Sequence, residues 1–219
     1  MSNKKRDELN SLRQGYKNPW QTQSKRPIYD NPWINIEEHA VITPAGTEGI
    51  YGVVSFKNTA VGVVPIDDEG YTWLVGQWRY VLNDYSWEIP EGGCPQEEAP
   101  AVCALRELKE ETGLSAEVLQ PLMRIHPSNS VCTEDGHLFV ATGLSQGDTE
   151  HEDTEDISVR RIHLDEAIDM AMQGDITDSL SLAALFKIAA LRSQWPATED
   201  DPHRMAWLTQ LPEPLPTSA

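Results

Sequence analysis

The sequence predicts an α/β or α+β sandwich, in which helices cover a mixed sheet. Two observations predict this fold class. Residues 33–90 divide into four or five strand-like runs that are separated by turn residues. The second half of the chain then alternates between runs with helical spacing and further strand-like runs, so helices and strands are mixed along the sequence.

The N-terminal segment, residues 1–32, is polar, mixed in charge and interrupted by prolines, so we expect an arm there. Strand-like texture starts at Trp33, in the runs WINIEEHAVI, IYGVVSF, TAVGVVPI and YTWLVGQW. These runs are rich in β-branched and aromatic residues, and segments such as TPAGTEG and DDEG separate them. The predicted globular domain therefore spans residues 33–194.

The period changes to that of a helix over residues 97–112. Pro100 suits the first turn of this helix, and Gly113 suits the left-handed residue that follows the last turn. Apolar residues at helical spacing predict one buried face, made of Ala101, Ala104, Leu105 and Leu108.

The remaining elements follow in order. Strands are predicted at AEVLQPLMRI and HLFVATGL, joined by the loop HPSNSVCTEDG, and the very acidic segment 147–157 is predicted to be a loop. A strand at SVRRIHL leads to two helices, DEAIDMAMQ and SLSLAALFKIAALRS, the second capped by Thr177 or Asp178. Residues 195–219 are rich in proline and lack a period, so we expect a surface arm or a disordered tail.

Charge and composition exclude several function classes. The formal net charge is −18, from 17 Lys and Arg against 35 Asp and Glu, and such a surface repels nucleic acid and anionic membranes. No apolar run is long enough to span a bilayer, so we expect a cytoplasmic protein. Three cysteines without a CxxC pair predict ordinary reduced thiols rather than a disulfide framework or a zinc site.

Three glutamates crowd one turn of the predicted central helix. Glu107, Glu110 and Glu111 stand at positions i, i+3 and i+4, so their carboxylates share one face and repel one another. One interpretation is a solvated acidic face. The other is a site for Mg²⁺ or Mn²⁺, because hard cations prefer carboxylate oxygens.

The surroundings of these glutamates resemble the box of the Nudix hydrolase family at every specified position. The pattern GX5EX7REUXEEXGU, where U is a bulky aliphatic residue, is formed by Gly92, Glu98, Arg106, Glu107, Leu108, Glu110, Glu111, Gly113 and Leu114. The resemblance implies an α/β/α sandwich and metal binding by Glu107, Glu110 and Glu111. Gly92 allows the tight turn before the helix, and Arg106 can pair with Glu98 to orient the neighbouring ligands.

The stretch GQWRYVLNDYSWEIPEGG is similar to a segment of the ADP-ribose and ADP-sugar pyrophosphatase branch of that family. The similarity implies that Arg79 binds phosphate, a role that suits a guanidinium, and a surface ion pair is the alternative. Glu91 stands where the branch commonly has alanine. The resemblance implies that its backbone carbonyl is a metal ligand, and a role for its side chain is left open.

The same branch implies further site residues. Glu134 is the expected general base, with Asp135 as its competitor, and Glu110 is a second catalytic carboxylate. The N-terminal strands, residues 33–58, look like those that form an intertwined homodimer, in which Trp33 and Tyr51 sandwich the base. Core or dimer packing is the alternative role for these two aromatic residues.

The resemblance therefore implies a dimeric, Mg²⁺- or Mn²⁺-dependent hydrolase with a small-molecule nucleotide substrate. The expected reaction splits ADP-ribose into AMP and ribose 5-phosphate. The alternatives are cleavage of GDP-mannose or another nucleotide, and a nucleotide sensor that keeps the fold without the reaction.

Overall fold

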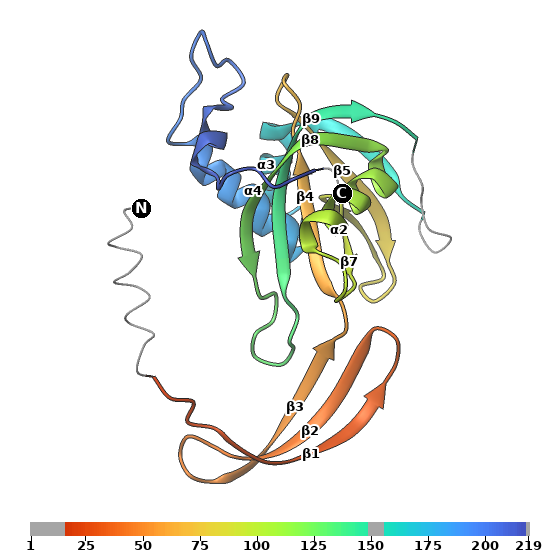
Figure 1. Cartoon of the computed structure of the whole chain (residues 1–219), viewed down its shortest axis with the longest axis vertical. Helices are drawn as coiled ribbons and strands as arrows, with labels where there is room; N and C mark the ends of the chain where they lie inside the picture. The colour runs from red at the N-terminus through yellow and green to blue at the C-terminus, as the bar shows by residue number, and fades with distance from the viewer. Residues whose placement is uncertain (1–15, 149–155, 218–219) are drawn as a thin grey trace. The chain divides into compact units, whose positions relative to one another are not determined.

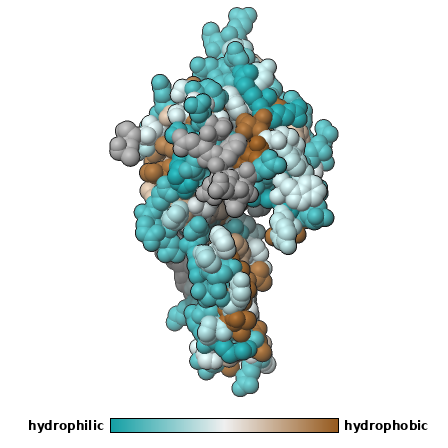
Figure 2. Space-filling view, turned by 90° about the vertical axis from the view of Figure 1, so that its right-hand side faces the viewer, coloured by the Kyte–Doolittle hydropathy of each residue, from teal (hydrophilic) through white to brown (hydrophobic). Residues whose placement is uncertain are grey.

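The N-terminal strands form a sheet of their own. A computed structural model of the chain describes residues 16–148 and 156–217, in two compact units that divide after Ser55. The first unit holds a three-stranded sheet in the order β1-β2-β3, made of Gln21–Asp30, Ile34–Ile42 and Glu48–Phe56 (Figure 1). Strand β1 pairs antiparallel with β2, and several hydrophobic side chains lie on the surface of this sheet (Figure 2).

Strand β1 corrects the expectation of an arm over residues 1–32. Residues 21–30 form a strand, whereas residues 1–15 lie outside the described part of the chain. All ten residues of β1 are exposed, so the strand needs no alternation of apolar and polar residues. That is why its polar composition resembled an arm.

The second unit is built on a mixed sheet, as the sequence predicted. Four strands lie in the order β7-β4-β9-β8, made of Glu91–Cys94, Thr59–Pro65, Gly136–Gln146 and Leu114–Ile125. The central pair β4 and β9 is parallel, and β7 and β8 add to it antiparallel. A second sheet has the order β10-β5-β6, made of Ser158–His163, Tyr71–Arg79 and Asp84–Glu88.

Helices cover both faces of the four-stranded sheet, which gives the predicted sandwich (Figure 1). Helix α2 (Pro100–Thr112) shares one hydrophobic cluster with the sheet, and helices α3 (Leu164–Gln173) and α4 (Ser179–Arg192) share another. The two clusters take alternate residues of β4, Val61 and Val63 on one side and Val64 on the other.

The helix boundaries follow the local signals in the sequence. Pro100 stands in the first turn of α2, and Gly113 ends it with φ 72° and its N–H bonded to the Lys109 carbonyl. Ala104 and Leu108 are fully buried, as expected, and Ala101 and Leu105 are half-buried. Asp178, rather than Thr177, caps α4 by accepting a hydrogen bond from the Ser181 N–H.

The C-terminal tail is ordered on the body of the second unit, so the expectation of a disordered segment is wrong for residues up to 217. A short 3₁₀ helix, η1 (Ala206–Gln210), buries Trp207 completely in the cluster around α3 and α4. Leu215 then pairs with Leu119 at the free edge of β8. Single apolar anchors hold this tail, and isolated anchors leave no periodic signal in a sequence.

Two further expectations concern segments rather than the core. Of the acidic loop 147–157, residues 149–155 lie outside the described part of the chain. Among the described residues, no helix is long and apolar enough to cross a membrane.

Candidate active site

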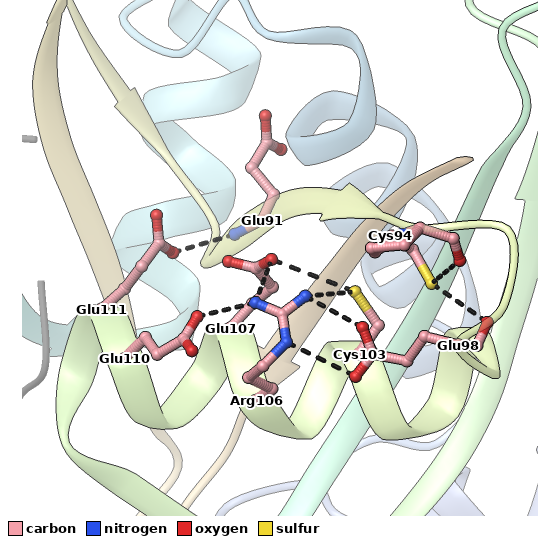
Figure 3. Close-up of polar contacts among 9 residues, drawn as sticks. Glu91, Cys94, Glu98, Cys103, Arg106, Glu107, Glu110 and Glu111 are labelled. Atoms are coloured by element: carbon pink, nitrogen blue, oxygen red, sulfur yellow. Dashed lines mark hydrogen bonds and ion pairs between the residues drawn. The ribbon is translucent and has the colours of Figure 1, made fainter. Parts of the chain in front are cut away.

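The three glutamates of α2 project from one side of the helix, as their spacing predicted (Figure 3). Glu107 is 8% exposed and Glu111 only 1%, whereas Glu110 is half-buried. A solvated acidic face is therefore wrong for Glu107 and Glu111. Two buried carboxylates on one helix face are stabilised only by a compensating positive charge or by hydrogen bonds.

Arg106 supplies part of that charge (Figure 3). Its guanidinium lies 3.1 Å from Glu98, 2.9 Å from Glu107 and 2.7 Å from Glu110. The expected pairing with Glu98 is present, and the contacts with Glu107 and Glu110 go beyond it. One arginine thus fixes carboxylates from the loop and from the helix in one arrangement.

The backbone of β7 passes directly over the buried glutamates. The N–H of Glu91 donates a hydrogen bond to Glu111 Oε2 at 3.0 Å. A Cβ atom added to Gly92 would lie 2.3 Å from Cδ of Glu107, closer than real atoms approach. Gly92 is therefore needed because any side chain would occupy the space of the Glu107 carboxylate.

These residues fit a divalent cation by their donor chemistry. Three carboxylates on one helix face offer the oxygen ligands that Mg²⁺ and Mn²⁺ prefer, and the absence of a side chain at Gly92 leaves room for the Glu107 carboxylate. The carbonyl of Glu91 belongs to the same short stretch of backbone, next to the N–H that contacts Glu111.

A cavity of about 640 Å³ lies beside this acidic face. Its walls are the hairpin between β5 and β6 and the residues that start α4, and Glu91 is shared with the acidic face. Arg79, Ser86, Glu88, Thr177 and Asp178 bring polar side chains to it. The volume is in the range of cavities that bind small molecules.

Arg79 lies in this cavity, as expected for a residue that contacts substrate, and it is also ion-paired. Its Nε donates to Glu88 Oε1 at 2.8 Å, and a second guanidinium nitrogen contacts the other oxygen of Glu88. The hydrogen bond to Glu88 raises the pKa of Arg79. The sequence analysis assigned no role to Glu88, which ends a strand of only five residues.

Glu91 has a side chain that is only 12% exposed, and the resemblance left its role open. Burial raises its pKa well above the ordinary value, and the negative charges of Asp178 and Glu88 raise it further. Arg79 lies 3.5 Å from its Oε1, and its Oε2 has no hydrogen-bond partner among the described residues. Burial and these charges therefore favour the protonated form of Glu91 in the metal-free protein.

The two candidates for the general base, Glu134 and Asp135, both lie in the loop between β8 and β9 but have different surroundings. Both oxygens of Asp135 accept hydrogen bonds from Arg124, at 2.6 and 2.9 Å, and His137 lies 3.3 Å away. Glu134 is half-buried, and its pKa is raised by burial and then by the charge of Asp178. Asp135 is therefore occupied by ion pairs with Arg124 and His137. Glu134 instead feels the charge of Asp178, a residue that lines the cavity.

The two aromatic residues expected at the base lie in the N-terminal unit. Trp33 is 67% exposed in the turn before β2. Tyr51, in β3, meets the ring of Trp20 edge-on, with centroids 5.4 Å apart, beside a small cavity that His39 also lines. Trp20 was missed because it falls in the segment taken for an arm.

Asp178 was missed as a site residue for a different reason. From the sequence, Asp178 was predicted only to cap α4, and it does so. In the folded chain its negative charge also raises the pKa of Glu91 and of Glu134. No local pattern links residue 178 to residues 91 and 134, because only the tertiary fold brings them together.

Comparisons with known proteins find matches for both units of the chain. The family profile of the NUDIX domain matches residues 56–183, and the profile described as nucleoside diphosphate sugar hydrolase N-terminal domain matches residues 20–54. The second match covers the strands of the N-terminal unit.

Individual relatives extend over most of the chain. An ADP-ribose pyrophosphatase of Bacillus subtilis (strain 168) is 30% identical over 166 residues, 75% of this chain and 89% of the relative. A methanol dehydrogenase activator of Bacillus methanolicus is 35% identical over 160 residues, 72% of this chain and 86% of the relative. A solved structure of an ADP compounds hydrolase has a TM-score of 0.73 at 22% identity and covers 82% of this chain and 97% of its own; it supports the fold.

Proposed function

The chain belongs to the NUDIX family, and we propose that it hydrolyses the pyrophosphate bond of nucleoside diphosphate sugars, with ADP-ribose as the preferred substrate. One observation carries the proposal: the carboxylates of α2 adjoin a cavity that presents Arg79, and Glu91 belongs to both. This arrangement supports the proposal, because carboxylates suit a divalent cation and a guanidinium suits the oxygens of a phosphate.

The substrate class is supported by two comparisons. The profile that matches residues 20–54 is named for nucleoside diphosphate sugar hydrolases, and the relative from Bacillus subtilis is named ADP-ribose pyrophosphatase. GDP-mannose and other sugar nucleotides share the diphosphate, so they form the competing substrates.

The cofactor in this proposal is Mg²⁺ or Mn²⁺, held by Glu107, Glu110 and Glu111 with the Glu91 carbonyl. When bound, it neutralises the diphosphate and lowers the pKa of a water molecule. Arg79, which lines the cavity, holds the diphosphate oxygens through its guanidinium. Arg106 and Glu98 keep the glutamates in position.

Glu134 is the general base in this mechanism. It accepts a proton from the attacking water, whose oxygen forms a bond to one phosphorus while the bond from that phosphorus to the bridging oxygen breaks. The products from ADP-ribose are AMP and ribose 5-phosphate, and Glu110 assists as a second carboxylate beside the reacting group.

We also propose that the N-terminal sheet forms a homodimer. Every residue of β1 is exposed, and large apolar side chains in β1, in β3 and in the turn before β2 are exposed as well, namely Ile28, Tyr29, Ile50 and Trp33. In the dimer, Trp33 of one subunit and Tyr51 of the other stack on the base. Sedimentation of a monomer at micromolar concentration would remove this role.

A substrate panel tests the reaction. The purified protein, with Mg²⁺, is offered ADP-ribose, other ADP-sugars, GDP-mannose and nucleoside triphosphates. We expect the highest kcat/KM for ADP-ribose, and fast turnover of another nucleotide without turnover of ADP-ribose would overturn the substrate. Nucleotide binding without any turnover would favour the alternative function, a nucleotide sensor that keeps the fold without the reaction.

A matched pair of variants tests the metal face. Glu111→Gln should reduce kcat by more than ~100-fold, since even partners of metal ligands affect activity by roughly 10- to 100-fold. Glu97→Gln is the control, because Glu97 is exposed in the loop before α2. Equal activity of the two variants would contradict the assignment of Glu111.

A further inference from the structure

Two of the three cysteines lie beside each other, next to the acidic face of α2 (Figure 3). Cys94 ends β7 and Cys103 lies in the early part of α2, and their side chains are 1% and 0% exposed. Their sulfur atoms and a carboxylate oxygen of Glu98 lie within 4.8 Å of one another. The spacing in the sequence contains no CxxC pair, so only the fold reveals this cluster.

We propose that Cys94, Glu98 and Cys103 form a site for a thiophilic divalent cation such as Zn²⁺ or Cd²⁺. Two sulfur ligands and one carboxylate oxygen are a donor set that Zn²⁺ accepts, with a fourth tetrahedral position left for water. Mg²⁺ prefers oxygen ligands throughout, so the donor chemistry separates this site from the glutamates of α2.

Arg106 supplies the positive charge in this cluster when no cation is bound. One of its nitrogens lies 3.1 Å from Glu98 Oε2 and 3.1 Å from Cys103 Sγ. Binding breaks the two S–H bonds, forms two bonds from sulfur to the cation and releases two protons to solvent, without any oxidation. Two thiolates and one carboxylate then carry three negative charges, of which the divalent cation neutralises two.

The site is coupled to the catalytic face through the same arginine. Arg106 holds Glu107 and Glu110 with its other terminal nitrogen, and Cys103 Sγ lies 3.9 Å from Glu107 Oε1. A cation at the cysteines competes with Arg106 for Glu98 and Cys103 and so shifts the guanidinium. Occupation should therefore weaken Mg²⁺-dependent turnover.

The test reads the cation directly and needs no turnover. Metal-free, reduced full-length protein is titrated with Cd²⁺ in the presence of excess Mg²⁺, and the ultraviolet absorption of the cadmium–thiolate bond is recorded. We expect one Cd²⁺ per chain in the wild type. Cys132→Ser is the matched control, because Cys132 is the third cysteine and lies in the loop between β8 and β9.

The variants decide the assignment. Cys94→Ser and Cys103→Ser should each weaken Cd²⁺ binding by at least ~10-fold, whereas Cys132→Ser should not. If Cys103→Ser fails to fold by circular dichroism, Cys94→Ser and Cys94→Ala decide alone. Unchanged binding in those variants, loss of binding in Cys132→Ser, or no absorption in the wild type would overturn the site.

This proposal stands apart from the hydrolase assignment. Glu111→Gln should keep the cadmium absorption while it loses turnover. A failed substrate panel therefore leaves the cysteine site intact, and a failed cadmium titration leaves the hydrolase intact.

Discussion

Arg79 and Glu88 form a two-point ion pair at the wall of the cavity. The Glu88 side chain is 3% exposed, whereas that of Arg79 is 37% exposed, so one partner is an anchor and the other faces solvent. Two of the five N–H groups of the guanidinium are used by Glu88, a further contact of 3.5 Å reaches Glu91, and Arg79 lines the cavity. The pair therefore has two effects. It gives the buried Glu88 carboxylate its hydrogen-bond partner, and it holds the Arg79 guanidinium at the wall of the cavity.

Replacing Arg79 should separate these two roles. Arg79→Ala leaves Glu88 buried without its partner, so we expect a loss of about 1–3 kcal/mol in the free energy of unfolding and a higher KM. The double variant Arg79→Ala with Glu88→Gln should recover most of the stability but not the KM. Denaturant unfolding and steady-state kinetics measure the two effects, and a recovered KM would show that Arg79 does not bind substrate.

The pH dependence of activity should respond to Asp178. The general base acts when deprotonated, so activity falls as the pH drops through the pKa of Glu134. Burial and the charge of Asp178 raise that pKa, and Asp178→Asn should therefore move the acid limb of the kcat/KM profile to lower pH. Asparagine can still accept the hydrogen bond from Ser181 that starts α4.

An exposed neighbour provides the control for this experiment. Asp175→Asn, in the same connection between α3 and α4, should leave the acid limb in place. Glu134→Gln should remove the limb together with most of the activity. An acid limb that Glu134→Gln retains would reassign the general base.

Glu91 should make the metal-free protein less stable as the pH rises. In the unfolded chain its carboxyl ionises near pH ~4.3, whereas in the folded chain its pKa is raised, so the folded state keeps the proton longer. The contribution of Glu91 to stability is therefore lost as the pH rises above ~4.3 toward the folded pKa.

Glu91→Gln tests this sign, because glutamine cannot ionise. In the presence of a chelator, the variant should exceed the wild type in free energy of unfolding at pH 7, because only the wild type must keep or lose a proton there. The difference should shrink below pH ~4.3 and vanish near pH ~3, where both states of the wild type are protonated. A variant that is less stable at pH 7 would show that the carboxylate is ionised and paired in the folded protein.

The sequence predicted the elements that carry local signals. Helix α2 was predictable because Pro100, Gly113 and its apolar spacing all agree with one element. Strand β1 was not, since an exposed strand has no buried face to pattern its residues. The tail was not either, because Trp207 and Leu215 pack as isolated anchors.

The residues of the candidate site also fall into those with a local sequence signal and those without one. The spacing of Glu107, Glu110 and Glu111 placed their carboxylates on one face, because helical geometry is local. Glu88 and Asp178 reach the cavity from distant parts of the chain, and no spacing rule connects them. The pairing of Cys94 with Cys103 likewise depends on how β7 packs against α2.

The last prediction concerns the anchor of the tail. Trp207 is fully buried against α3 and α4, so Trp207→Ala should cost about 3–5 kcal/mol in the free energy of unfolding. Its Nε1 has no hydrogen-bond partner among the described residues, so Trp207→Phe removes a buried polar group and should cost less than ~1.5 kcal/mol. Denaturant unfolding measures both, with the exposed Met172→Ala of α3 as the control. If Trp207→Ala matched Met172→Ala, the tail would contribute little to the core, and its removal from residue 195 onward would leave the second unit stable.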